Sequence, residues 1–136
     1  MLELTNVRKT FNKGTINEKK ALNGISLSLN DGDFVTVIGG NGAGKSTMLN
    51  MIAGVYPIDS GKIEIGGINI SRQPEHKRAK FIGRVFQDPM KGTAAGMEIQ
   101  ENMALAFRRG KRRGLGWGIR AKEKDYYRDM LTRLGL

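Results

Sequence analysis

Cysteine is absent from the 136 residues, and its absence removes several kinds of chemistry at once. Disulfide bonds, thiolate metal sites and cysteine nucleophiles are all excluded. Long hydrophobic runs are missing too, since none approaches the roughly 20 apolar residues that a transmembrane helix needs. The first dozen residues mix charged with apolar side chains, which a signal peptide does not do. We therefore expect a cytosolic protein, whose length fits one domain or part of a larger one.

Negative charge is scarce relative to positive charge in the second half of the chain. Residues 1–70 carry seven Lys and Arg against six Asp and Glu, whereas residues 71–136 carry sixteen against seven. The excess centres on the basic cluster Arg108–Arg113. Such a run is typical of nucleic-acid binding, of attraction to anionic lipid headgroups, or of a solvated surface. Because Phe107 and Trp117 only flank the cluster, it lacks the interleaved aromatics of a single-strand binder, which argues against nucleic acid.

Hydrophobic residues follow strand periods in most of the chain and helix periods in its last third. The run Phe34–Ile38 is almost wholly apolar and β-branched, which is typical of a strand covered on both faces. A polar connection precedes the last predicted strand, and the pattern indicates an α/β core over residues 1–96 followed by a helical part over 97–136. We predict strands at 2–11, 21–29, 34–38, 62–65, 68–70 and 81–86, and helices at 45–53, 97–109 and 120–134.

A glycine-rich stretch, IGGNGAGKST at residues 38–47, lies between the third predicted strand and the first predicted helix. Gly39–Ser46 fits the pattern G-x-x-x-x-G-K-[ST] at all eight positions and in the required strand–loop–helix setting. A phosphate group needs several converging N–H donors, so the backbone must wrap around it, and glycines remove the side chains that would obstruct this. The following helix points its free N–H groups and its positive dipole end at the same oxygens.

Two side chains of the loop have specific roles in this interpretation. Lys45 supplies a mobile cation for the terminal phosphates, and the Ser46 hydroxyl is a hard oxygen ligand suited to Mg²⁺. The alternative, a glycine-rich turn that happens to precede a lysine, does not account for the complete pattern in its structural setting. The sequence therefore predicts that the loop binds a nucleotide triphosphate, with the binding residues Gly39, Gly40, Asn41, Gly42, Ala43, Gly44, Lys45, Ser46 and Thr47.

Three stretches together resemble the ATP-binding subunit of an ABC transporter: GGNGAGKST, LNMIAGVYPIDSGKIEIGG and VFQDP. The resemblance covers essentially the whole chain. It implies an α/β fold of the P-loop NTPase type with an antiparallel β subdomain, a nucleotide-binding core, and the start of a helical subdomain. It also implies that the nucleotide is ATP and that Mg²⁺ accompanies it.

Two further residues take their roles from this resemblance. Phe11 lies where the family has the aromatic that stacks on adenine, and Gln87 lies where it has the glutamine of the Q-loop. Lys45 and Gln87 are then the catalytic residues of this chain, and Ser46 and Gln87 its Mg²⁺ ligands. On the residues alone, Phe11 is equally compatible with a core position at a strand end, and Gln87 with a turn residue. A polar amide at the end of a buried strand is, however, where open α/β sheets place ligand contacts.

Several catalytic parts of the family are not found in these 136 residues. No Asp-Glu pair occurs for the Mg²⁺-binding aspartate and the glutamate that activates water. The LSGGQ signature is absent, and His76, in a charged stretch, does not match the family's late histidine. We therefore expect this chain to represent the N-terminal part of an ATP-binding domain, able to bind nucleotide but inactive alone.

The resemblance implies partners as well. In the family, two ATP-binding subunits form a dimer sandwich and dock on a transmembrane permease, so the subunit is cytoplasmic and peripheral on the inner face of the cell membrane. The segment 92–120 resembles importer ATPases, which suggests solute import powered by ATP binding and hydrolysis in the complete form. The basic cluster would then lie near the permease and approach lipid headgroups. The alternatives are an ABC-type ATPase acting on nucleic acid or ribosomes, and a non-catalytic nucleotide-binding fragment.

Overall fold

The structure, a computed structural model, describes residues 1–111 and 118–136. It contains two compact units, which comprise residues 1–82 and 83–136 and are described separately below. The units divide after Ile82, whereas the sequence pattern changes after residue 96. Segment 83–96 belongs with the helical part because Asn102 donates to the carbonyl oxygen of Ala94 and accepts from its N–H. The expected boundary of the core at residue 96 stays a prediction.

The first unit is built on a four-stranded antiparallel sheet with the strand order β2-β1-β3-β4. Its two long strands form a hairpin in which Leu4 faces Leu27 and Phe11 faces Lys19. Alternating apolar residues bury one face of these strands, as expected from a period of two. The strands are β1 (Leu2–Phe11), β2 (Lys19–Leu29), β3 (Ser60–Ile65) and β4 (Ile68–Asn69).

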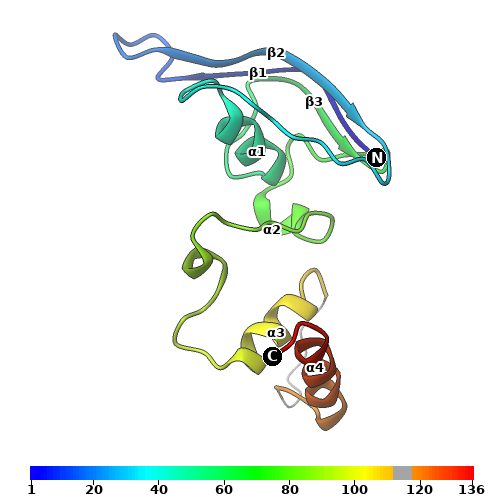
Figure 1. Cartoon of the computed structure of the whole chain (residues 1–136). Helices are drawn as coiled ribbons and strands as arrows, with labels where there is room; N and C mark the ends of the chain where they lie inside the picture. Colours follow the sequence, from blue (N-terminus) through cyan, green and yellow to red (C-terminus); the bar gives the residue numbers. More distant parts are fainter. Residues whose placement is uncertain (112–117) are drawn as a thin grey trace. The chain divides into compact units, whose positions relative to one another are not determined.

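Helix α1 (Lys45–Ala53) packs beneath this sheet (Figure 1). Its residues Met48 and Met51 are buried together with side chains of the strands. The helix ends at Gly54, whose left-handed φ of 89° and N–H bonds to the last turn form the expected glycine stop. The core of the unit comprises Leu4, Val7, Leu22, Met48, Met51, Ile63 and Ile70.

Arg78 is buried inside this unit, although the sequence places it in a polar connection. It is the last residue of α2 (Glu75–Arg78) and only 2% exposed. Its guanidinium donates to the carbonyl oxygens of Met51 and Ile52, at the negative end of α1, and to those of Ser71 and Gln73. Burial lowers the pKa of Arg78, and an arginine nevertheless stays charged at neutral pH. The side chain therefore clamps the end of α1 to the β4–α2 segment.

Two predicted strands do not form. Phe34–Ile38 has no regular secondary structure and pairs with no strand among the described residues, and Phe34 and Ile38 are 94% and 89% exposed. Phe81–Phe86 likewise joins no ladder: Phe81 packs against the core, while Val85 is 97% exposed. The prediction of strands here was wrong for this structure. Apolar residues favour a strand, but a strand also needs a neighbour that accepts and donates its backbone hydrogen bonds.

The second unit contains a short 3₁₀ helix, Pro89–Gly92, and the helices α3 (Ile99–Phe107) and α4 (Ala121–Arg133). Both α helices fall within the ranges predicted from their apolar spacing. Tyr127 is buried and lies against Phe107, with 6.1 Å between the ring centroids. An ion pair of 2.8 Å between Arg108 and Glu123 links the end of α3 to the first turn of α4. None of the helices in the described ranges is long and apolar enough to cross a membrane.

Candidate functional site: a phosphate-binding loop beside Phe11

The loop predicted to bind phosphate leads directly into α1, as expected. Gly44 caps the helix with φ 89°, and its carbonyl oxygen accepts the N–H of Met48 at 2.8 Å. A Cβ atom at Gly44 would lie 2.7 Å from the carbonyl oxygen of Ala21 and 2.9 Å from the Leu22 side chain. Glycine is therefore required here for the loop to lie against β2. The N–H groups of the first turn of α1 have no acceptor within the helix and remain available to an anion.

Lys45 lies inside the loop. Its half-buried side chain brings Nζ to 2.5 Å from the carbonyl oxygen of Gly39 and 2.7 Å from that of Gly40. An ammonium group has three donors, so a third remains for a phosphate oxygen while both of these bonds persist. Gly39 and Gly40 thus contribute by holding the lysine, which the sequence pattern alone did not indicate.

A hollow of about 350 Å³ lies over the start of α1 and brings Phe11 together with the loop. This volume is in the range of small-molecule sites. Phe11 is half-buried and lies outside the core, with the ring of Tyr56 packed edge-on against it at a centroid distance of 5.3 Å. The alternative of a core residue is therefore not supported. The hollow is lined by Phe11, Lys19, Ala21, Asn41, Gly42, Ala43, Gly44, Lys45, Ser46 and Thr47.

The charge of this hollow suits a polyanion. Its lining contains two lysines, Lys19 and Lys45, and no aspartate or glutamate. Lys19 was not among the residues predicted from the sequence. The signal that could have found it is the β1–β2 hairpin, because a register that places Lys19 opposite Phe11 brings it to the same end of the sheet.

Ser46 is exposed in the hollow, where its hydroxyl fits the role of an Mg²⁺ ligand. Within the described ranges, no group of three or more His, Asp or Glu side chains is arranged to hold a metal ion. In the first unit, Ser46 would therefore hold Mg²⁺ jointly with the phosphate oxygens of the nucleotide. Mg²⁺ commonly binds in this way, through few protein ligands plus substrate phosphates.

Gln87 belongs to the second unit and is exposed. It precedes Asp88, whose carboxylate accepts the N–H of Met90 and caps the 3₁₀ helix. The structure therefore brings Phe11 together with the loop inside the first unit, whereas Gln87 belongs to the other unit. The catalytic and metal-binding roles of Gln87 stay predictions.

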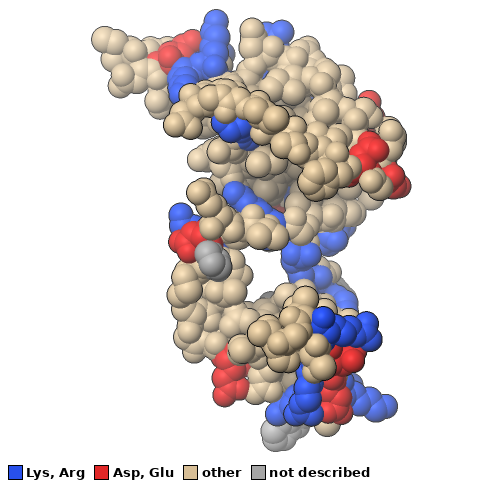
Figure 2. All heavy atoms as spheres, in the orientation of Figure 1, with Lys and Arg blue, Asp and Glu red and all other residues tan. Residues whose placement is uncertain are grey.

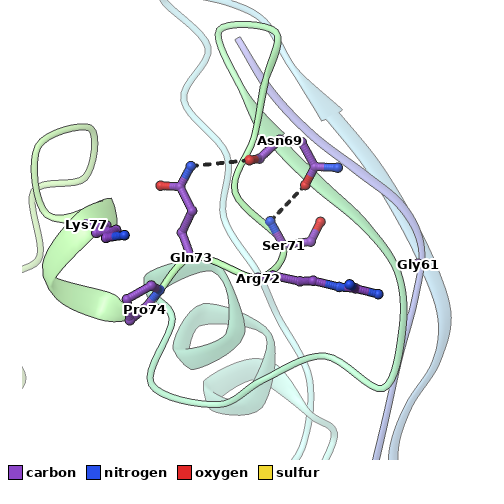
Figure 3. Close-up of a pocket in the computed structure, with 7 residues that line it drawn as sticks. All are labelled: Gly61, Asn69, Ser71, Arg72, Gln73, Pro74 and Lys77. Carbon is purple, nitrogen blue, oxygen red and sulfur yellow. Dashed lines mark hydrogen bonds between the residues drawn. The ribbon is translucent and has the colours of Figure 1, made fainter.

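A second hollow in the first unit is larger, about 570 Å³, but fits a phosphate less well. Figure 3 shows its polar lining, in which Asn69 accepts hydrogen bonds from the N–H of Ser71 and the side chain of Gln73. The two cations of this hollow, Arg72 and Lys77, lie well apart in that view. It thus lacks converging cations and a loop of free N–H donors. The smaller hollow at the glycine loop is the better candidate site.

The basic cluster is only partly described, because Arg112, Arg113 and the flanking Trp117 lie outside the described residues. Of the rest, Arg108 is paired with Glu123, and Nζ of Lys111 lies 3.9 Å from the ring centroid of Phe107. Figure 2 shows Lys and Arg mixed with Asp and Glu around α3 and α4. On the face that Figure 2 shows, the described residues of this unit therefore do not form a continuous basic surface of the kind that nucleic acid would require.

Comparisons with known proteins agree with this geometry. A family model described as ABC transporter matches residues 22–136. A tyrosine transport ATP-binding protein of Clostridioides difficile is 38% identical over 125 residues, which are 92% of this chain and 50% of that protein. A spermidine/putrescine import ATP-binding protein of Haemophilus influenzae is 36% identical over 108 residues, 79% of this chain and 27% of its own length.

Relatives differ in the direction of transport. A bacitracin export ATP-binding protein of Halalkalibacterium halodurans is 34% identical over 93 residues, 65% of this chain and 36% of that protein. Among solved structures, a dimeric ATP-binding cassette in a post-hydrolysis state, bound to ADP and Pi, aligns with a TM-score of 0.77 and 29% identity, covering 100% of this chain and 58% of that one. The chain thus spans about half the length, or less, of these proteins.

Proposed function

This chain belongs to the ABC transporter family, and on that basis we propose that it is the ATP-binding part of a transporter's energy-coupling subunit. In the complete protein it would power solute import by binding and hydrolysing ATP. The observation that supports this best is the hollow that joins Phe11 to the glycine loop and Lys45. It offers an aromatic surface for the base and a cationic, N–H-rich cradle for the phosphates of one nucleotide.

Within this proposal each site residue has a distinct task. Phe11 stacks on adenine, Lys45 and the N–H groups of the loop neutralise the phosphates, and Ser46 holds Mg²⁺. Bound Mg²⁺ neutralises charge that develops on the phosphates during transfer. Gln87 senses the nucleotide and couples it to the permease. The partners would be a second ATP-binding subunit and a transmembrane permease at the inner face of the cell membrane, where the basic cluster would contact lipid headgroups.

Titration of residues 1–136 with a fluorescent ATP analogue tests the nucleotide site. We expect Lys45→Ala to weaken MgATP binding about a hundredfold, because a hydrogen bond to a charged group contributes about 1.5–3 kcal/mol. The matched control is Lys20→Ala, which removes an exposed lysine of β2 that does not line the hollow. Equal affinity of Lys45→Ala and the parent chain would remove the loop from the proposed site.

A second titration distinguishes the contribution of the adenine base to the binding affinity from that of the phosphates. Phe11→Ala should weaken both ATP and adenosine by the ~1–3 kcal/mol of a stacked base, whereas Lys45→Ala should leave adenosine binding unchanged. Circular dichroism checks the fold of each variant. An unfolded Phe11→Ala chain would restore the interpretation of Phe11 as a core residue.

Hydrolysis requires more than these residues. The attacking water needs an oriented base, and the sequence shows no Asp-Glu pair that could supply one. We therefore expect steady-state phosphate release from residues 1–136 to equal that of its Lys45→Ala variant. Turnover of the parent chain that Lys45→Ala abolishes would show that these 136 residues contain a catalytic base after all.

The transport role is tested with a longer protein that contains this chain, reconstituted in vesicles with its transmembrane permease. In that assembly Gln87→Ala should retain ATP binding and lose solute-stimulated turnover. Loss of preloaded solute from vesicles that carry the ATP-binding face outward would demonstrate import. Solute accumulation inside the same vesicles would reassign the subunit to export.

A further inference from the structure

We propose that Lys19 is a second cation of the nucleotide site, which binds the phosphates from the β2 side of the loop. This inference rests on the proposed function, and the family pattern of the glycine loop does not include Lys19. It deepens the description of the site because it assigns the phosphates two ammonium groups from different elements. One is Lys45 on α1, and the other is Lys19 at the start of β2.

The hairpin places Lys19 at the hollow. Lys19 is the first residue of β2 and lies directly opposite Phe11 on β1. Its side chain extends to the tip of the loop, since Nζ lies 3.5 Å from the position that a Cβ atom would occupy at Gly42. The aromatic residue for the base and the lysine for the phosphates are thus held at the same end of one hairpin.

Lys19 is free to bind a ligand. Within residues 1–111 and 118–136 its ammonium group makes no hydrogen bond or ion pair. Two other lysines of this region differ in this respect, since Lys45 donates to two loop carbonyls and Lys9 pairs with Asp59 at 3.0 Å. All three donors of Lys19 are therefore available to phosphate oxygens.

The electrostatics of the hollow favour the same assignment. Two ammonium groups and no carboxylate line it, so without a ligand the two positive charges face one cavity. An anion with several charges, such as a nucleoside diphosphate or triphosphate, neutralises both at once. Because Lys19 reaches the loop tip at Gly42, we expect it to contribute to binding of ADP as well as ATP.

The experiment titrates residues 1–136 with ATP, ADP and adenosine in parallel. Lys19→Met keeps the apolar stem and removes the charge. We expect it to raise the Kd for ATP and for ADP about three- to tenfold, in line with a partly exposed charge-assisted contact. The Kd for adenosine should not change, and Lys19→Arg should restore most of the loss. Repeating the titrations in about 1 M salt, where charges are screened beyond roughly 3 Å, should shrink the difference.

Lys20→Met is the matched control. It removes the neighbouring lysine, which is also exposed but does not line the hollow, so the affinities should equal those of the parent chain. If Lys19→Met binds all three ligands like the parent chain, the inference is wrong while the proposed function stands. If Lys19→Met weakens adenosine as much as ATP, its stem shapes the base site and the inference is also wrong. A parent chain that binds no ATP would overturn the proposed function and this inference together.

Discussion

The antiparallel sheet and the two unpaired apolar runs have comparably apolar sequences but form different structures. β1, β2 and β3 alternate apolar and polar residues, and each finds a hydrogen-bonding neighbour within the first 65 residues. The runs Phe34–Ile38 and Phe81–Phe86 are at least as apolar, yet no strand among the described residues pairs with them. Ile63 of β3 is fully buried, whereas Phe34 is 94% exposed. Hydrophobicity alone therefore does not make a strand.

This difference shows that antiparallel strands and strands covered on both faces have different requirements. An antiparallel neighbour can follow through a short turn, whereas a parallel neighbour comes across a connection of a dozen or more residues. A strand covered on both faces also needs elements packed above and below it. We interpret Phe34–Ile38 as a core strand of the family's sheet that has no neighbouring strand within residues 1–111 and 118–136. The following predictions test that contrast, from the largest expected effect to the smallest.

The largest effect should come from Arg78, the clamp within the well-packed unit. Arg78→Met removes the donor for four carbonyl oxygens. We expect a loss of about 3–5 kcal/mol in the free energy of unfolding, since a buried polar group without a partner is costly. Urea denaturation measures it. Arg72→Met, an exposed arginine of the same segment, is the control and should cost less than about 0.5 kcal/mol. A loss below about 1 kcal/mol for Arg78→Met would mean that water replaces the clamp.

The direct comparison of the two kinds of apolar segment uses one truncation in each. Ile63→Ala in β3 should lower the free energy of unfolding by about 3 kcal/mol, because the side chain is 0% exposed. Phe34→Ala should change it by less than about 0.5 kcal/mol. Similar losses in the two variants, measured by denaturant midpoints, would show that Phe34 is buried in solution.

The exposed run should also limit solubility, because an unpaired apolar edge invites association. Phe34→Lys should raise the fraction of residues 1–136 that stays soluble after centrifugation by about twofold or more. The control is Leu134→Lys, which adds the same charge at a residue that is 76% exposed in the second unit. If both variants gain equally, net charge rather than the unpaired run governs solubility.

The smallest effect should be the pH dependence at Asp59, which ties the segment after α1 to β1. Burial by itself raises the pKa of this carboxyl, but hydrogen bonds from the Thr10 N–H and from Lys9 outweigh it, so the pKa is lowered. The folded pKa thus lies below the unfolded value near 3.8. The stabilisation is present above that value and is lost as the pH falls through the folded pKa.

The measurement compares Asp59→Asn with the parent chain across pH. The side chain of Asp59 is 40% exposed, so we expect a difference below about 1 kcal/mol at pH 7 that begins to close below about pH 4. A difference that does not shrink as the pH falls below about 4 would assign the effect to packing instead of charge.

Much of the molecule could be predicted from the sequence because it depends on local patterns. The glycine loop and α1 could be predicted because one sequence pattern serves three purposes. The same residues allow the tight loop, begin the helix and bind phosphate. The hairpin follows from alternation, and the two late helices from apolar spacing. The prediction of Phe11 came from resemblance, and the hollow beside the loop now supports it.

What only the tertiary structure decided involves residues far apart in the chain. In the sequence, Arg78 is one of several charged residues in a polar segment. Its burial depends on four carbonyl groups of the same unit that converge on its guanidinium. The sequence gives no reason to place Lys19 at the site. The hairpin register brings its side chain beside Gly42. The apolar run Phe34–Ile38 shows the reverse case, because its pattern predicts a strand, yet no strand of the described part of the chain pairs with it. Local sequence determines which residues can donate hydrogen bonds, carry charge or form a strand. Only the three-dimensional arrangement determines whether the acceptor, ligand site or neighbouring strand that each one needs lies beside it.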